Sequence, residues 1–333
     1  MKNRYAAVRN WLLAGITLIS GMAAAAAFGP VVVPRPMDEL VPQMVLHLGK
    51  TADWVTLTAD AVWVGSTGPF AVHRIDPVRN ALVATVKLPG EPCAGITSGF
   101  GSLWIPLCGK VTALARVSLE SNTLTAVFKV GPAGPEGGVT AGADRVWLVL
   151  DRKGTLAGIN PVTGRVQTRI HVPRGSYNPF YRDGLLWVTR AEGAEVTAVD
   201  PATGRVVSST HTGPKPRFLT AGDGQVWSLN QGDGSLTQID AGSGSTIRHV
   251  MLGTPGSGGD ISLGGGMVWT TMPKVPLTAV DRSTGVVRCQ WTGAGGDSLA
   301  IGHDAIWLTD YSGGTISRLD LGDALHRCVQ APG

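Results

Sequence analysis

Val62-Trp63-Val64 decides the fold, because a tryptophan at the centre of a short strand-like stretch recurs six more times along the chain. The later copies are Leu103-Trp104-Ile105, Val146-Trp147-Leu148, Leu186-Trp187-Val188, Val226-Trp227-Ser228, Val268-Trp269-Thr270 and Ile306-Trp307-Leu308. Successive tryptophans lie 41, 43, 40, 40, 42 and 38 residues apart. A period of about forty with strand-like content in each copy is the signature of a radial repeat. Seven copies therefore predict an all-β, seven-bladed β-propeller.

The unit around each tryptophan contains four short segments in which polar and apolar residues alternate, as they do in half-buried strands. In the third unit these are an inner strand near 138–141, the tryptophan strand, a third strand at 156–160 and an outer strand at 165–172. The last hairpin carries an acid or amide before a tight turn, as in Asn160-Pro161-Val162-Thr163-Gly164. Such residues are turn formers, so we interpret them as structural. Little of the sequence is typical of helix.

The two ends of the repeat predict how the ring closes. The seventh unit supplies three strands, the last at 316–321, whereas an unpaired strand at 44–48 precedes the first unit. Placing that strand as the fourth of the last blade closes the ring and covers both sheet edges. The predicted organisation is thus a propeller over 43–333, preceded by an extended lead-in at 28–42.

Residues 1–27 have the layout of a secretory signal peptide, with Lys2, Arg4 and Arg9 before an apolar stretch that ends in small residues. A retained membrane anchor is the alternative for the same segment. The formal net charge falls from +4 to +1 when these three positive charges are removed, which argues against a nucleic-acid partner. We therefore expect a monomeric periplasmic or secreted protein with no membrane span after signal removal.

Four cysteines in a chain expected in an oxidising compartment favour disulfides, and four cysteines allow three pairings. Cys93 and Cys108 flank a short hairpin that would bring its two ends together, so we favour this pair. Cys289 and Cys328 then remain for the second pair. They occupy equivalent places in neighbouring units, so a bridge between them requires the tail at 325–330 to leave the seventh blade and lie on the sixth.

The alternation of Val-Trp-Val strands with Ile-Asp-Pro-x-Thr-Gly turns resembles the YVTN-type β-propeller proteins, and the blade spacing is similar to that of the streptogramin (virginiamycin B) lyase family. The resemblance covers about 44–320 and lacks the Gly-His and Trp-Asp dipeptides of WD40 repeats. Propellers of this kind include binding proteins, lyases and lactone hydrolases. The lyase resemblance implies histidines at the starts of inner strands and a metal held by glutamates.

In a propeller, the first residues of the inner strands and the last residues of the second strands meet around the central channel on one face. The residues about ten before each tryptophan are Asp53, Cys93, Glu136, Asn178, Arg217, Asp260 and Asp297. Those three after each tryptophan are Ser66, Leu107, Leu150, Arg190, Asn230, Met272 and Asp310. From these positions and two adjacent aromatic residues we predict a ligand-binding face made of Asp53, Trp54, Glu136, Tyr177, Asn178, Arg190, Arg217, Asp260, Asp297 and Asp310.

Several carboxylates that face one narrow opening repel one another, which raises their pKa values unless a cation offsets the charge. Arg190 and Arg217 are the candidate side chains for that offset, and a bound Ca²⁺ or Mg²⁺ is the alternative. The candidate metal ligands are Glu136, Asn178, Asp260 and Asp297. A third interpretation is structural, with the acids bonding backbone amides of the tight glycine turns at 258–260 and 295–297. No other cofactor is predicted.

Histidine placement gives the sharpest test of an enzymatic function. We expect the seven histidines in outer strands, in a third strand, in a turn on the opposite face and in the tail: His47, His171, His211, His249, His73, His303 and His326. None is predicted at the channel face, where the lyase resemblance requires one. We therefore favour a non-catalytic binding or interaction module that takes a small-molecule or protein ligand at an acidic channel face. The alternative is a metal-dependent lyase or lactone hydrolase on the same face.

Overall fold

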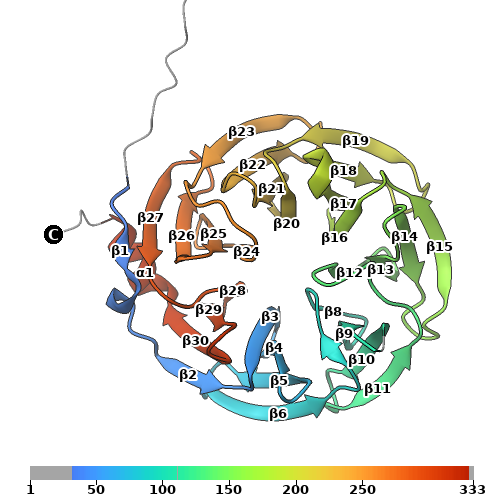
Figure 1. The fold of residues 1–333 in the computed structure, drawn as a ribbon, viewed down its shortest axis with the longest axis horizontal. Helices are drawn as coiled ribbons and strands as arrows, with labels where there is room; N and C mark the ends of the chain where they lie inside the picture. Colours follow the sequence, from blue (N-terminus) through green and yellow to red (C-terminus); the bar gives the residue numbers. More distant parts are fainter. Residues whose placement is uncertain (1–31, 111, 330–333) are drawn as a thin grey trace, which may run out of the picture. The chain divides into compact units, whose positions relative to one another are not determined.

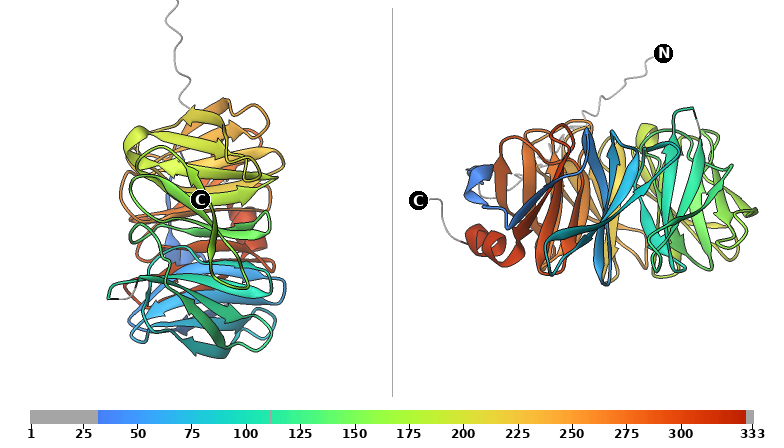
Figure 2. Two further views of the ribbon diagram at one scale, coloured as in Figure 1. Left: turned by 90° about the vertical axis from the view of Figure 1, so that its right-hand side faces the viewer. Right: turned by 90° about the horizontal axis from the view of Figure 1, so that it is seen from below.

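The structure is a computed structural model that describes residues 32–110 and 112–329. The predicted signal at 1–27, the start of the predicted lead-in and the last residues of the tail lie outside the described residues. Within this range the chain forms seven sheets around a central axis, one for each tryptophan copy (Figure 1). This arrangement confirms the seven-bladed β-propeller. The strands of each blade run between the two faces of the ring (Figure 2).

The strands of each blade follow one another outward from the axis. Blade one contains β3 (Thr51–Thr58), β4 (Ala61–Thr67), β5 (Ala71–Asp76) and β6 (Ala81–Lys87). Blade two contains β7 (Glu91–Pro92), β8 (Thr97–Gly99), β9 (Ser102–Cys108), β10 (Ala113–Ser118) and β11 (Leu124–Phe128). Blade three contains β12 (Val139–Gly142), β13 (Arg145–Val149), β14 (Thr155–Ile159) and β15 (Val166–His171).

The remaining blades repeat the same order. Blade four contains β16 (Ser176–Arg182), β17 (Leu185–Arg190), β18 (Glu195–Val199) and β19 (Val206–His211), with the 3-10 turn η2 (Ala191–Gly193). Blade five contains β20 (Pro216–Gly222), β21 (Gln225–Asn230), β22 (Ser235–Asp240) and β23 (Thr246–Met251). Blade six contains β24 (Asp260–Gly264), β25 (Met267–Met272), β26 (Val275–Asp281) and β27 (Val287–Thr292). Blade seven contains β28 (Leu299–Gly302), β29 (Ala305–Asp310), β30 (Thr315–Asp320) and β2 (Met44–His47).

The repeated tryptophans lie in the second strand of each blade, and all seven are buried. They pack against apolar side chains of their own and neighbouring blades, as Trp63 does against Leu103 and Ile105 of blade two. In four blades the indole N–H donates to the carbonyl of the residue five positions earlier, which is Gly99, Gly142, Gly264 or Gly302. Each blade is therefore anchored by one large apolar side chain, and in these four blades its polar atom also fixes the end of the inner strand.

The ring closes as the sequence predicts. β2 pairs with β30 in an antiparallel register that places Met44 opposite Arg318 and His47 opposite Thr315. The Leu48 N–H donates to the carbonyl of Gly314 at 2.8 Å. Gly314 has a left-handed φ of +62°, and a Cβ there would lie 2.0 Å from the Gly49 carbonyl oxygen, so only glycine fits this contact.

The C-terminal tail forms a helix, α1 (Leu321–Val329), directly after the last strand. The Asp320 carboxylate accepts a hydrogen bond from the Asp323 N–H at 2.7 Å, as an N-cap residue does. Leu321 and Leu325 then pack against the core shared by blades six and seven. The prediction of little helix is confirmed, and the sequence did not locate this one helix because a capping aspartate and a turn-forming aspartate look alike in sequence.

None of the helices in the described ranges has the length and apolar character needed to cross a lipid bilayer.

The lead-in before β2 is not merely extended, because it also adds to blade six. β1 (Arg35–Pro36) pairs in parallel with β27 on the outer edge of that blade, and η1 (Met37–Glu39) is a short 3-10 turn. Arg35 binds Glu39 with a 3.2 Å ion pair. Both ends of the described chain thus lie on blade six, as Figure 1 shows for β1 and α1.

Both predicted disulfides are present. Cys93 and Cys108 are bonded with Cα atoms 5.7 Å apart, at the two ends of the predicted hairpin. Cys289 on β27 is bonded to Cys328 on α1, with Cα atoms 5.2 Å apart. The second bridge confirms that the tail crosses from blade seven to blade six.

Replacing Cys289 and Cys328 together by serine should lower the stability of the propeller. The bridge closes a separation of 39 residues, and its loss releases unfolded-chain entropy worth about 2–4 kcal/mol. Thermal unfolding of the double variant should therefore occur at a lower temperature, and thiol titration of the wild-type protein should detect no free thiol. An unchanged unfolding temperature, or reactive thiols in the native protein, would contradict this assignment.

Candidate functional site

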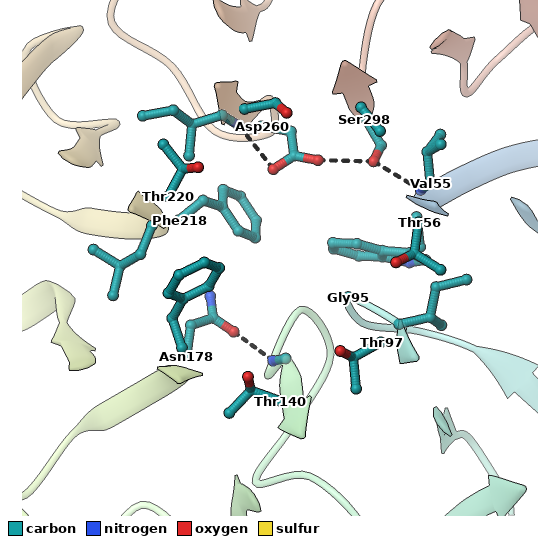
Figure 3. A pocket seen from close by; sticks show the side chains of 18 of the residues that line it. Val55, Thr56, Gly95, Thr97, Thr140, Asn178, Phe218, Thr220, Asp260 and Ser298 are labelled. Atoms are coloured by element: carbon teal, nitrogen blue, oxygen red, sulfur yellow. Dashed lines mark hydrogen bonds between the residues drawn. The ribbon is translucent and has the colours of Figure 1, made fainter. Parts of the chain in front are cut away.

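Two pockets lie along the channel and share Trp54. The mouth pocket has a volume of about 510 Å³, and its acidic and aromatic lining consists of Asp53, Trp54, Glu91, Glu136, Asp297, Asp310 and Tyr311. The channel pocket has a volume of about 330 Å³ and is lined by residues of the innermost strands. Figure 3 shows the channel pocket from close by.

The structure divides the predicted ligand-binding face between these pockets. The mouth pocket contains Asp53, Glu136, Asp297 and Asp310. The channel pocket contains Asn178 and Asp260, and both pockets contain Trp54. Neither pocket is lined by Tyr177, Arg190 or Arg217. The sequence therefore placed most of these residues near the channel but did not resolve their depth.

Asp53 and Asp297 both line the mouth pocket, close enough for the charge of one to act on the other. The Gly259 N–H donates to Asp297 Oδ1 at 3.4 Å. Burial raises the pKa of Asp53 well above its ordinary value, and the neighbouring charge of Asp297 raises it further. The Trp54 N–H also donates to Asp53 Oδ1 at 2.7 Å. Burial also raises the pKa of Asp297, so both acids hold a proton more readily than an exposed aspartate does, which reduces the predicted repulsion among the channel acids.

Glu136 has its charge balanced by Arg217. Arg217 Nε and Nη2 both donate to Glu136 Oε2, at 3.1 and 2.7 Å. The same guanidinium lies 4.5 Å from the centre of the Tyr177 ring, and the Tyr177 hydroxyl donates to the carbonyl of Pro135. The Glu136 N–H donates to the Cys93 carbonyl at 2.7 Å. The loop before β12 is therefore tied to blades two, four and five beside the mouth.

Arg190 does not offset the channel acids, contrary to the sequence prediction. Its Nη1 donates to Glu195 Oε2 at 3.0 Å, and its Nε donates to the carbonyl of Arg174 at 3.0 Å. Arg190 and Glu195 face each other across β17 and β18. The prediction was wrong because it considered only the channel positions and not the acid on the adjacent strand.

The predicted metal ligands do not form one cluster. Glu136 and Asp297 line the mouth pocket, whereas Asn178 and Asp260 line the channel pocket. Across the described part of the chain, no group of three or more His, Cys, Asp or Glu side chains is arranged to hold a metal ion. The structure thus provides no ligand set that would make the predicted Ca²⁺ or Mg²⁺ site.

Asp260 instead joins blades six and seven. Its Oδ2 accepts hydrogen bonds from Ser298 Oγ at 2.8 Å and from the Leu299 N–H at 3.3 Å, and its Oδ1 accepts from the Ile261 N–H. Ser298 Oγ in turn accepts from the Val55 N–H of blade one at 3.1 Å, so one chain of hydrogen bonds crosses three blades (Figure 3). The structural interpretation of this acid is therefore the one that its contacts support.

Threonines two residues after the tryptophan form a second set of links that sequence reasoning missed. Thr189 Oγ1 accepts from the Asn178 N–H and donates to the Arg217 carbonyl of the next blade. Thr271 Oγ1 accepts from the Asp260 N–H and donates to the Asp297 carbonyl in the same way. Their fixed position two residues after the tryptophan is the sequence signal that could have predicted these links.

No histidine of the described chain lines either pocket, and the buried His73 has a structural setting. His73 Nε2 lies 2.8 Å from the Oγ of Ser66, which lines the mouth pocket, and burial lowers the pKa of His73 to about 4. Thr85 lies at its other ring nitrogen, so no acid orients the imidazole. Blade five has a contact like that of His73 with Thr85, but there the threonine, Thr237, lies on the third strand and the histidine, His249, lies on the outer strand. We therefore interpret both contacts as polar links within a blade.

A family described as "Outer membrane protein assembly factor BamB" matches residues 110–323, which is more than half of the chain. The chain belongs to this family. The crystal structure of BamB from Moraxella catarrhalis superposes on it with a TM-score of 0.62 and 14% sequence identity, covering 84% of this chain and 97% of that chain. At this identity the superposition shows the shared propeller fold alone.

No curated protein sequence matches the chain. The BamB family match supports the propeller that the sequence resemblance implied. A closer relationship to YVTN-type proteins or streptogramin lyases stays a prediction.

Between pH 4 and 7 the contribution of Asp260 to the stability of this BamB-family propeller should rise as the pH falls. Burial raises the pKa of Asp260 from 3.8 to about 6, so in this window the folded protein holds a proton that the unfolded chain has released. The effect of this one residue on the free energy of unfolding is at most about 3 kcal/mol. In chemical unfolding experiments, an Asp260→Asn variant should therefore lose stability relative to the wild type as the pH falls from 7 to 4.

The matched control is Asp281→Asn, because hydrogen bonds to Arg288 and to turn amides hold the Asp281 pKa below its ordinary value. That variant should keep the wild-type slope above pH 4. An equal slope in Asp260→Asn and wild type would show that Asp260 is not the titrating group.

Proposed function

We propose that the protein is a periplasmic or secreted propeller that acts as a binding module, and that its acidic mouth pocket receives a positively charged group of a protein partner. The family description names outer membrane protein assembly, which favours a protein partner over a small molecule. The two disulfides are consistent with an oxidising compartment.

The observation that carries this proposal is the unbalanced charge of the mouth pocket. Five carboxyl groups line it, those of Asp53, Glu91, Glu136, Asp297 and Asp310, and none of its lining residues in the described chain is Lys, Arg or His. Only Glu136 has a cationic partner, since Arg217 binds it from beside the pocket. The raised pKa values of Asp53 and Asp297 reduce the negative charge that these two acids carry. The pocket is left with a negative charge for a ligand to neutralise.

Aromatic rings add a second attraction for a cation. Trp54 and Tyr311 both line the mouth pocket, and burial together with the nearby acids raises the pKa of the Tyr311 hydroxyl. An ammonium or guanidinium group gains free energy over such rings, especially when it is partly desolvated. The chain already uses this chemistry once, because Arg217 binds a carboxylate and an aromatic face together.

A metal-dependent lyase or lactone hydrolase is not favoured by any contact in the described chain. Such an enzyme needs converging metal ligands and an acid or base at the channel face, and two of the four candidate ligands, Asp260 and Asn178, are engaged in links between blades. The binding module is the function that agrees with the geometry.

Neutralising two mouth acids should weaken the binding of a basic peptide. We expect a fluorescent lysine-rich peptide to bind the wild-type protein and a glutamate-rich peptide not to bind. The double variant Glu91→Gln, Asp310→Asn should lose about 1 kcal/mol per removed charge, or roughly fivefold in affinity for each. Fluorescence anisotropy at two salt concentrations measures this effect, and the higher salt should reduce it.

Glu120→Gln serves as the control, because Glu120 is an exposed acid in the turn after β10 and away from the mouth. It should leave peptide affinity unchanged. Equal binding of both peptides, or equal losses in the control and in the double variant, would rule out the mouth pocket as the cation site.

A further inference from the structure

A ring of small hydroxyl side chains lines the channel pocket at one depth. In all seven blades the residue seven positions before the repeated tryptophan lies directly opposite that tryptophan in the inner hairpin. Five of these residues are hydroxyl side chains, namely Thr56, Thr97, Thr140, Thr220 and Ser262. Figure 3 shows the four threonine hydroxyls turned toward the middle of the pocket.

Two of these hydroxyls link neighbouring blades. Thr140 Oγ1 accepts a hydrogen bond from the Tyr181 N–H at 3.0 Å. Ser262 Oγ accepts one from the Ile301 N–H at 3.3 Å. The hydroxyl at this position therefore has a structural role, because it accepts a hydrogen bond from a backbone N–H of the next inner strand.

In blades one, two and five this link is not made. The hydroxyls of Thr56, Thr97 and Thr220 have no hydrogen-bond partner among the described residues. Thr220 is 8% exposed, and its hydroxyl faces the pocket. Because these three hydroxyls make no bond to the protein, they are available to bond to a molecule inside the channel.

The rest of the pocket selects against charge. Asp260 is the one ionisable side chain among its lining residues, and its oxygens already accept three hydrogen bonds from the protein. Phe180 and Phe218 supply apolar ring surface, and Phe218 lies 6.1 Å from Trp54 between ring centres. The pocket thus combines free hydroxyls with aromatic walls and offers no charge for an ionic ligand.

We propose that the channel pocket binds a small uncharged ring that carries hydroxyl groups, as a monosaccharide does. Threonine hydroxyls can donate to and accept from sugar hydroxyls, while the aromatic walls cover the apolar face of the ring. The volume of about 330 Å³ lies at the lower end for ligand sites and suits a single ring. This site is separate from the acidic mouth pocket and does not depend on the function proposed for it.

The test uses calorimetric titration and saturation-transfer NMR with D-glucose, D-galactose and N-acetyl-D-glucosamine. At least one sugar should bind saturably, with a dissociation constant on the order of 1 mM. The double variant Thr97→Val, Thr220→Val should weaken that binding about tenfold while keeping the wild-type unfolding temperature, because neither hydroxyl bonds to the protein. Asp297→Asn, at the mouth, should leave sugar affinity unchanged.

Thr140→Val is the matched control within the same ring. It removes the partner of the Tyr181 N–H, so it should lower the unfolding temperature, unlike the double variant. The proposal is overturned if none of the three sugars shows saturable binding at sugar concentrations well above 1 mM. That result would mean that the pocket holds only water. It is also overturned if the Thr97, Thr220 variant binds sugar as tightly as wild type does.

Discussion

Burial of one tryptophan per blade is the interaction on which the rest of this structure depends. The side chain fills the space between blades, and in four blades its N–H also bonds to a glycine carbonyl at the end of the inner strand. Loss of such a side chain costs about 3–5 kcal/mol, so the register between the inner and second strands is strongly fixed. Every position counted from the tryptophan then lies at a set depth along the channel.

That register explains why the channel separates into layers of different chemistry. The residues about ten positions before the tryptophan bond to the neighbouring blade where that blade offers a hydrogen-bond partner. Where it offers none, they line the mouth pocket. Asp260 and Asn178 bond to a neighbouring blade, whereas Asp53 and Asp297 line the mouth pocket. The hydroxyl ring seven residues before the tryptophan lies deeper and is free of charge. Function is thus distributed along the axis rather than around one ring of residues.

The sequence was sufficient to predict the features that depend on the period of the tryptophan repeat. Blade number, ring closure by 44–48 and both disulfides follow from evenly spaced tryptophans and from the places of Cys289 and Cys328 in the repeat. It was not sufficient where a contact between different blades decides the outcome. Arg190 bonds to the adjacent strand, and Asp260 bonds to the next blade, because their partners are set by three-dimensional neighbours that no periodicity records.

The central claim is that burial and the nearby charge of Asp297 favour a proton on Asp53 until a cationic group enters the mouth. The most direct measurement is calorimetry of lysine-rich peptide binding near pH 6 in two buffers of different ionisation enthalpy. If the account is right, binding releases protons in the wild-type protein, and Asp53→Asn abolishes that release because its amide cannot lose a proton. Binding that exchanges no protons, or that takes them up, would contradict the account.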